Sequence, residues 1–133
     1  MKKTLLALTV CSLVPVGCAD PGSVVCNNTA MTFAVAPATA TANHSSAAPG
    51  NQVQFKSTLA PTPQAGCPTP TFIAVAYPTW TNPDPLDISI SSAQDSTNGT
   101  AVCSGMTSGP VTLTATETTP QQTYMQNVTL TCQ

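Results

Sequence analysis

Charged residues are scarce in this chain of 133 residues. They make up 6% of it, with three Lys and Arg residues against five Asp and Glu. Two of the cations are Lys2 and Lys3, so Lys56 carries the one full positive charge in the rest of the chain. A surface that binds phosphate groups needs clustered Lys and Arg. This scarcity excludes nucleic acid as a partner and argues against electrostatic attachment to an anionic membrane.

Groups that could perform catalysis are also few. His44 is the one histidine, and it lies in the polar stretch Ala-Asn-His-Ser-Ser. A Ser-His-Asp arrangement needs a base held by a buried acid, and no acid can be assigned to His44. Asp84 and Asp87 lie in and after Asn-Pro-Asp-Pro, a context that favours a turn over a calcium site. No phosphate loop or dinucleotide fingerprint occurs. We therefore predict no catalytic residue, no cofactor and no metal site.

Threonine, serine, alanine and proline dominate what is present, and the hydrophobic fraction is 41%. In residues 110–117 and 127–133 apolar residues alternate with threonines; the apolar positions are Val111, Leu113, Ala115, Val128, Leu130 and Cys132. Alternation with a period of two is typical of half-buried strands, and the short polar connection predicts an antiparallel hairpin. A hairpin is not stable alone, so the rest of the chain must supply the surface against which it packs.

Further strands are predicted over residues 31–35, 39–42, 53–59, 72–77, 86–91 and 100–103, with turn signals between them. Pro37 places the first of these at a sheet edge or at a kink, because proline lacks the amide hydrogen. The continuous apolar run 72–77 suits a central strand covered on both faces. About seven antiparallel strands in residues 30–133, with a tryptophan near the third main strand, predict an all-β immunoglobulin-like β-sandwich. Its expected core residues are Trp80, Phe55, Val53, Leu113 and Leu130.

Residues 1–17 have the features of a signal peptide. Lys2 and Lys3 form a positive region, and residues 5–16 form an apolar region too short to span a bilayer stably. Residues 14–18, Val-Pro-Val-Gly-Cys, resemble a bacterial lipobox, which implies lipidation of Cys18. Pro15 departs from that motif, and cleavage after Ala19 is the alternative. Residues 18–29 read as a tether leading into the domain.

The strand pattern resembles the bacterial immunoglobulin-like domains, especially the group 2 type of exported and surface proteins. The matching stretches are Val35-Ala36-Pro37-Ala38-Thr39-Ala40, Pro49-Gly50-Asn51-Gln52-Val53-Gln54-Phe55, Pro78-Thr79-Trp80-Thr81, Ile88-Ser89-Ile90-Ser91 and Gly109-Pro110-Val111-Thr112-Leu113-Thr114-Ala115-Thr116. Their order covers roughly residues 31–131. The insertion around Cys67 and the four domain cysteines depart from the common pattern. The resemblance implies a stalk or adhesion module at the cell surface and does not imply a particular ligand.

Six cysteines occur, of which Cys11 lies in the signal segment. With Cys18 assigned to the lipid, Cys26, Cys67, Cys103 and Cys132 remain, an even number that in an exported chain indicates two disulfide bonds. Three pairings are open. In the expected sandwich the ends of the strands favour Cys26–Cys67 and Cys103–Cys132. Zinc ligands usually come in close pairs, and these cysteines are far apart, which disfavours a metal site.

These observations leave three hypotheses for function. The first is a non-enzymatic module at the cell surface, a lipoprotein of the outer membrane or cell surface used for adhesion, structural spacing or protein contact. The second is a soluble secreted carbohydrate-binding or inhibitor domain, which an accessible Trp80 would favour. The third is an enzyme with an unfamiliar site around His44 or the aspartates. Tyr124 and Met125, in the connection of the hairpin, are possible contact residues for an unknown protein or glycan partner.

Overall fold

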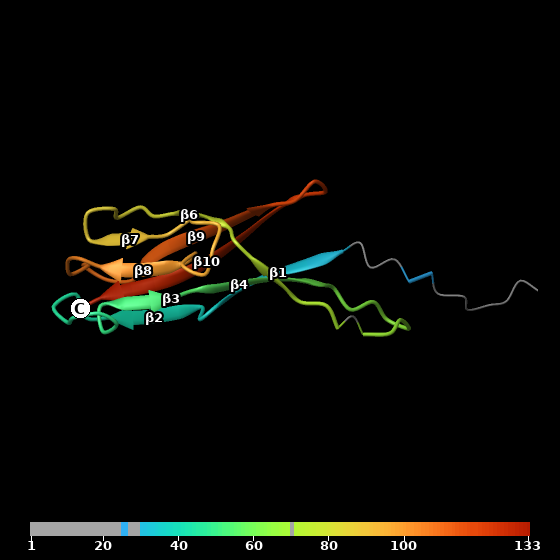
Figure 1. Cartoon of the computed structure of the whole chain (residues 1–133), viewed down its shortest axis with the longest axis horizontal. Coiled ribbons are helices and arrows are strands. Elements are labelled where there is room, and N and C mark those ends of the chain that lie inside the picture. The colour runs from blue at the N-terminus through green and yellow to red at the C-terminus, as the bar shows by residue number, and fades with distance from the viewer. Residues whose placement is uncertain (1–24, 27–29, 70) are drawn as a thin grey trace, which may run out of the picture.

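The computed structural model describes residues 25–26, 30–69 and 71–133, and in these residues the chain is all-β and contains no helix. The strands are β1 (Met31–Ala36), β2 (Thr39–Ala42), β3 (Gln52–Gln54), β4 (Lys56–Pro61), β5 (Ala74–Ala76), β6 (Thr79–Thr81), β7 (Ile88–Ile90), β8 (Thr100–Cys103), β9 (Val111–Thr118) and β10 (Thr123–Cys132). Figure 1 shows their arrangement, with the C-terminus beside β2 and the segment between β4 and β5 extending from the other end of the sheets.

Three sheets are formed, with strand orders β1-β4-β5, β3-β8-β7 and β2-β10-β9-β6. Strands β3 and β4 follow one another directly, separated by Phe55 alone, so the two three-stranded sheets adjoin at this residue. Side chains from all three sheets meet in one core, where Phe55 contacts the ring of Trp80 with centroids 5.7 Å apart. Phe55, Leu113 and Leu130 are fully buried, Trp80 is buried, and Val53 packs against the core in a half-buried position.

The predicted C-terminal hairpin is present, because β9 and β10 pair antiparallel from Val111↔Leu130 to Thr123↔Thr118. Its strands are longer than predicted. A tight connection is closed by a hydrogen bond of 3.0 Å that the backbone N–H of Thr119 donates to the carbonyl of Gln122. Tyr124 and Met125 therefore lie within β10 and not in a polar connection, which corrects the sequence prediction.

One strand pair differs from the prediction of antiparallel strands alone. The chain leaves β1, which pairs antiparallel with β4, and enters β2, which pairs parallel with β10 in the other sheet. Pro37, which cannot donate a ladder hydrogen bond, lies between β1 and β2, where the pairing changes. The number of strands also exceeds seven, because the chain is further divided at Phe55 and at Tyr77-Pro78.

The apolar run at residues 72–77 is not a central strand covered on both faces. Only Ala74–Ala76 is a strand, and it pairs with β4 on one side, at the edge of its sheet. Pro78 interrupts the chain before it continues as β6 in the four-stranded sheet. An apolar run alone does not reveal how many partners a strand has, and Phe72, Ile73 and Val75 remain exposed here.

Candidate functional site

A pocket of about 500 Å³ lies where the two three-stranded sheets adjoin. Its lining residues come from the end of β3, from β4, from β5 and the residue after it, and from the turn before β8. They are Gln54, Lys56, Ser57, Thr58, Val75, Ala76, Tyr77, Asp95, Ser96 and Asn98. Lys56 is exposed between the buried residues Phe55 and Ser57, so Lys56 lies on the outer face of the sheet. The pocket is therefore open to solvent on the outside of this layer.

Two opposite charges line this pocket. The Asp95 carboxylate accepts hydrogen bonds from the hydroxyl of Thr97 at 2.6 Å and from its backbone N–H at 2.8 Å. These two bonds lower the pKa of Asp95 below its ordinary value, because they favour the charged form. The Lys56 ammonium forms no ion pair with any residue that the structure describes. The pocket thus offers one carboxylate and one ammonium that do not neutralise each other by direct contact.

Asn98 holds the wall of the pocket in place. Its buried amide nitrogen donates to the carbonyl oxygens of Pro78 and Ala93, at 3.0 and 2.8 Å. Its backbone carbonyl accepts from Nε2 of Gln54 at 2.6 Å. Since these partners come from three separate segments of the chain, the turn that carries Asp95 and Ser96 is fixed against both β3 and the crossover after β5.

Gly99 allows this turn to approach β4 closely. Its φ of +77° lies in the left-handed region that favours glycine, and a Cβ atom here would overlap the carbonyl oxygen of Phe55. The carbonyl of Gly99 in turn accepts the N–H of Phe55 at 2.9 Å. The glycine is required by the close packing of two backbones beside the pocket.

An exposed apolar surface borders the pocket. Phe72, Ile73 and Val75 have exposed fractions of 64%, 67% and 68%, and together we call them the apolar ridge. They lie beside and within β5, whose second edge has no neighbouring strand among the described residues. Exposed apolar side chains that gather on one part of a surface are typical of contact surfaces.

Tyr124 and Met125, the contact residues predicted in the hairpin, differ in how far they are buried. Tyr124 is half-buried and packs against the core, with its ring centroid 6.3 Å from that of Phe33. Met125, on the opposite face of the same strand, is 68% exposed. Tyr124 therefore contributes to packing, whereas Met125 presents most of its side chain to solvent.

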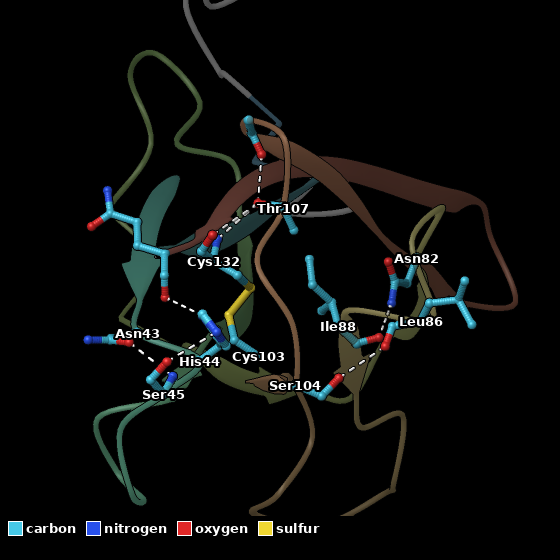
Figure 2. Close-up of a disulfide and its surroundings, with 12 residues drawn as sticks. Asn43, His44, Ser45, Asn82, Leu86, Ile88, Cys103, Ser104, Thr107 and Cys132 are labelled. Atoms are coloured by element: carbon cyan, nitrogen blue, oxygen red, sulfur yellow. Dashed lines mark hydrogen bonds between the residues drawn. A yellow bond between two sulfur atoms is a disulfide. The ribbon is translucent and has the colours of Figure 1, made fainter.

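His44 links a loop to the end of β10 (Figure 2). Its Nδ1 donates to the carbonyl oxygen of Gln133 at 2.6 Å, and its Nε2 accepts from the hydroxyl of Ser45 at 3.1 Å. The backbone N–H of His44 donates to the same carbonyl, and the N–H of Gln133 donates to Ala42. These bonds continue the parallel pairing of β2 with β10. The Ser45 hydroxyl lies on an exposed loop, outside the residues that line the pocket. The contacts of His44 are therefore structural: they hold the loop after β2 against the end of β10.

The aspartates at residues 84 and 87 lie in a turn, as predicted. The backbone N–H of Asp84 donates to the side chain of Asn82, and the carbonyl of Asp84 accepts from Ile88. The amide of Asn82 donates to the carbonyl of Ile88 at 2.6 Å (Figure 2). In the described residues no group of three or more His, Cys, Asp or Glu side chains could hold a metal ion.

Disulfide bonds join Cys26 to Cys67 and Cys103 to Cys132, the pairs expected from the sandwich. Cys103 and Cys132 are buried at the ends of β8 and β10, so this bond links two different sheets across the core (Figure 2). Thr107 adds to this region by accepting the N–H of Cys132 and donating its own N–H to the Cys132 carbonyl, both at 3.1 Å. Two disulfides are compatible with an oxidising environment.

The sequence prediction did not identify the pocket. In the sequence Lys56 is notable only as an isolated cation, and no motif marks Tyr77 or Asp95. They lie on segments separated by about twenty residues each, and no local motif connects them. The predicted signal segment and Cys18 lie outside the described residues, and of the predicted tether at residues 18–29 only Val25 and Cys26 are described.

Comparison of the chain with protein-family models, with curated proteins and with solved structures finds no match. In the described part of the chain no helix is long and apolar enough to cross a membrane. The function must therefore be argued from the fold and from the surfaces described above.

Proposed function

We propose that this chain is an exported, disulfide-bonded immunoglobulin-like module that makes a protein contact at the cell surface. The fold part of the proposal rests on the strand order. In immunoglobulin-like sandwiches the first, second, fifth and fourth strands form one sheet, and the third, sixth and seventh form the other. Counting β3 and β4 as one strand, β1, β4, β8 and β7 correspond to the first sheet, and β6, β9 and β10 to the second. The short β5 is an addition that leads into β6.

The apolar ridge carries the functional part of the proposal. Edge strands present unpaired backbone groups, and natural proteins usually protect them with charges, prolines or coverage. Here the edge beside Phe72, Ile73 and Val75 is apolar and exposed. A partner protein that covered these side chains would remove apolar surface from water, which is the main driving force of protein association. The module thus acts by binding, with residues 72–75 at the contact.

Export and lipidation form part of the same proposal. A signal at residues 1–17 with lipid on Cys18 would anchor the module at the outer membrane or cell surface, and cleavage after Ala19 would release it as a secreted protein. The intact mass of the natively exported protein, alkylated with and without reduction, separates these forms. Added acyl mass on a chain beginning at Cys18 supports the anchored form. A chain retaining residues 1–17 would contradict the export proposal.

Site-specific crosslinking tests the contact. A photoreactive amino acid placed at Ile73 in the native exporting cell should yield a defined crosslinked species, identified by mass spectrometry. The matched control is the same amino acid at Thr112, an exposed position of β9 on the four-stranded sheet. The same crosslinked protein should disappear when Phe72 is changed to Ser in the Ile73 variant. Equal yields at Ile73 and Thr112, or no species at Ile73, would overturn the contact.

The alternative function, a carbohydrate-binding domain with Trp80 as its platform, loses the feature that would favour it. Trp80 is 7% exposed and its indole N–H is bonded within the protein. A saccharide cannot stack on a ring that is packed against Phe55 and Asn98. Any ligand of this class would have to use a different surface.

A further inference from the structure

The pocket beside β4 has groups that the packing of the protein does not use. Among the described residues the lining hydroxyls of Ser57, Thr58, Tyr77 and Ser96 have no hydrogen-bond partner, and Lys56 has no ion pair. The Ser57 hydroxyl is itself buried, so it does not reach a ligand. The Gln54 side chain, by contrast, donates to Asn98 and accepts from Thr100 at 2.6 Å, so it supports the wall. The groups available to a ligand are therefore three hydroxyls, one ammonium and the remaining lone pairs of the Asp95 carboxylate.

The charges of these groups indicate what kind of ligand fits. An anionic ligand would be attracted by Lys56 and repelled by Asp95, and a cationic ligand would experience the reverse. A neutral ligand with hydroxyl groups avoids this conflict, because a hydroxyl can accept from an ammonium and donate to a carboxylate. Hydrogen bonds to charged groups are the stronger ones, so Lys56 and Asp95 would contribute most.

The remaining walls are apolar. Val75 is exposed beside the pocket, and the half-buried ring of Tyr77 adds an apolar surface with a polar end. A pyranose ring has the same division, with C–H groups on its faces and hydroxyls around its rim. The volume of about 500 Å³ lies within the range of small-ligand pockets and leaves room for more than one sugar unit.

We infer that this pocket binds a neutral saccharide, with Lys56 and Asp95 bonded to its hydroxyls and Tyr77 and Val75 against a ring face. This activity goes beyond the proposed protein contact. A free amino acid or a short peptide, which carries one ammonium and one carboxylate, would also match the two charges. The three unpaired hydroxyls of the pocket favour the saccharide. The ammonium and the carboxylate of a peptide would pair with Asp95 and Lys56 and would leave these hydroxyls without partners.

The test is an NMR titration of the disulfide-intact protein. Amide shifts are followed as neutral trisaccharides of glucose (cellotriose, maltotriose) or of N-acetylglucosamine (chitotriose) are added up to about 20 mM, with dialanine as the zwitterionic probe. We expect at least one trisaccharide to shift the amides of Lys56, Tyr77 and Asp95. Asp95→Asn should weaken that binding about tenfold, because a neutral amide replaces the charged carboxylate that accepts from the sugar hydroxyl.

Controls separate a binding role from a structural one. Asp84→Asn removes a carboxylate from a turn outside the pocket and should leave the affinity within about twofold. Tyr77→Phe keeps the ring and removes the hydroxyl, and it should retain most of the affinity, whereas Tyr77→Ala should lose about tenfold. Each variant must keep the amide spectrum of the folded protein outside the pocket.

Three results would overturn the inference. They are no shift with any trisaccharide, shifts that lie away from the pocket, and tighter binding of dialanine than of every trisaccharide at Lys56 and Asp95. The titration reads residues 56, 77 and 95, and the crosslinking reads residues 72 and 73. Failure of the saccharide site therefore leaves the protein contact standing, and the converse also holds.

Discussion

The indole Nε1 of Trp80 donates a hydrogen bond of 3.1 Å to Oδ1 of Asn98, and both side chains are buried. Trp80 belongs to β6 of the four-stranded sheet, and Asn98 lies in the turn that leads into β8 of another sheet. The bond thus joins two sheets at the wall of the pocket. A buried indole N–H without an acceptor is costly, so Asn98 supports both the core and the pocket.

Replacing Asn98 should therefore destabilise the whole protein. Asn98→Leu leaves the N–H of Trp80 and the carbonyls of Pro78 and Ala93 without their partners, and we expect the free energy of unfolding to fall by about 2–4 kcal/mol. Urea denaturation monitored by tryptophan fluorescence measures this. Asn127→Ala, at an exposed position with one side-chain bond to Thr114, should change it by less than about 0.5 kcal/mol. Equal effects of the two substitutions would contradict the role of Asn98.

Gly99 and Gly109 form a matched pair for a test of backbone geometry. Gly99→Ala introduces a Cβ in the left-handed region and against the Phe55 carbonyl, and it should lower the free energy of unfolding by at least about 2 kcal/mol. A Cβ at Gly109 would meet no atom within 4 Å. Gly109→Ala should therefore leave the melting temperature within about 3 °C, whereas Gly99→Ala should lower it by about 10 °C. A neutral Gly99→Ala would show that the turn can move away from β4.

The two disulfides should differ in what their removal costs. The linked residues are 41 and 29 positions apart in the sequence. This difference in loop length changes the entropic contribution to the free energy of unfolding by only about 0.3 kcal/mol. Loss of Cys103–Cys132 also leaves small voids in the core, where both side chains are about 1% exposed. We expect the double variant Cys103→Ala with Cys132→Ala to lose about 3–5 kcal/mol, and more than Cys26→Ala with Cys67→Ala. Calorimetry of both variants decides this, and the reverse order would contradict it.

The hydrogen bonds of Thr97 should control the titration of Asp95. The pKa of Asp95 is lowered chiefly by the Thr97 hydroxyl and then by its backbone N–H. Thr97→Val removes the hydroxyl and should raise the pKa of Asp95 towards its ordinary value, measured by NMR of the carboxyl carbon against pH. Thr97→Ser retains a hydroxyl and should keep the pKa low. An unchanged pKa in Thr97→Val would assign the shift to another cause.

The direction of the accompanying stability effect follows from linkage. A carboxyl whose pKa is lower in the folded than in the unfolded state stabilises the protein above the unfolded pKa. That contribution of Asp95 is lost as the pH falls through its folded pKa. Because the carboxylate is fully exposed, the pH dependence of unfolding should change little in Thr97→Val, and the NMR titration is the sensitive measurement.

Local chemistry made part of this molecule predictable. The alternation of apolar residues with threonines around Leu113 and Leu130 predicts the hairpin, because each strand must bury one face. The even number of widely spaced cysteines predicts two disulfides, and the position of Cys103 and Cys132 at the ends of predicted strands favours their pairing. Prolines at positions 37 and 78 mark where strands end, because they cannot donate a ladder hydrogen bond.

Which strands pair with one another could not be predicted from the sequence. A run such as residues 72–77 reads alike in a central strand and at an edge, because periodicity reports faces and not neighbours. The sequence predicts Tyr124 in the connection of the hairpin, whereas it lies in β10, because the hairpin strands extend beyond their region of regular alternation.

The amino-acid sequence by itself determined the all-β class, the hairpin and the content of the core, because these depend on which side chains avoid water and at what spacing. Tertiary structure alone decided the parallel pairing of β2 with β10, the exposed edge at β5 and the pocket. The pocket gathers Lys56, Tyr77 and Asp95 from three segments, and their meeting depends on a crossover between sheets and on the buried bonds of Asn98. Long-range packing of this kind leaves no local pattern in the order of the residues.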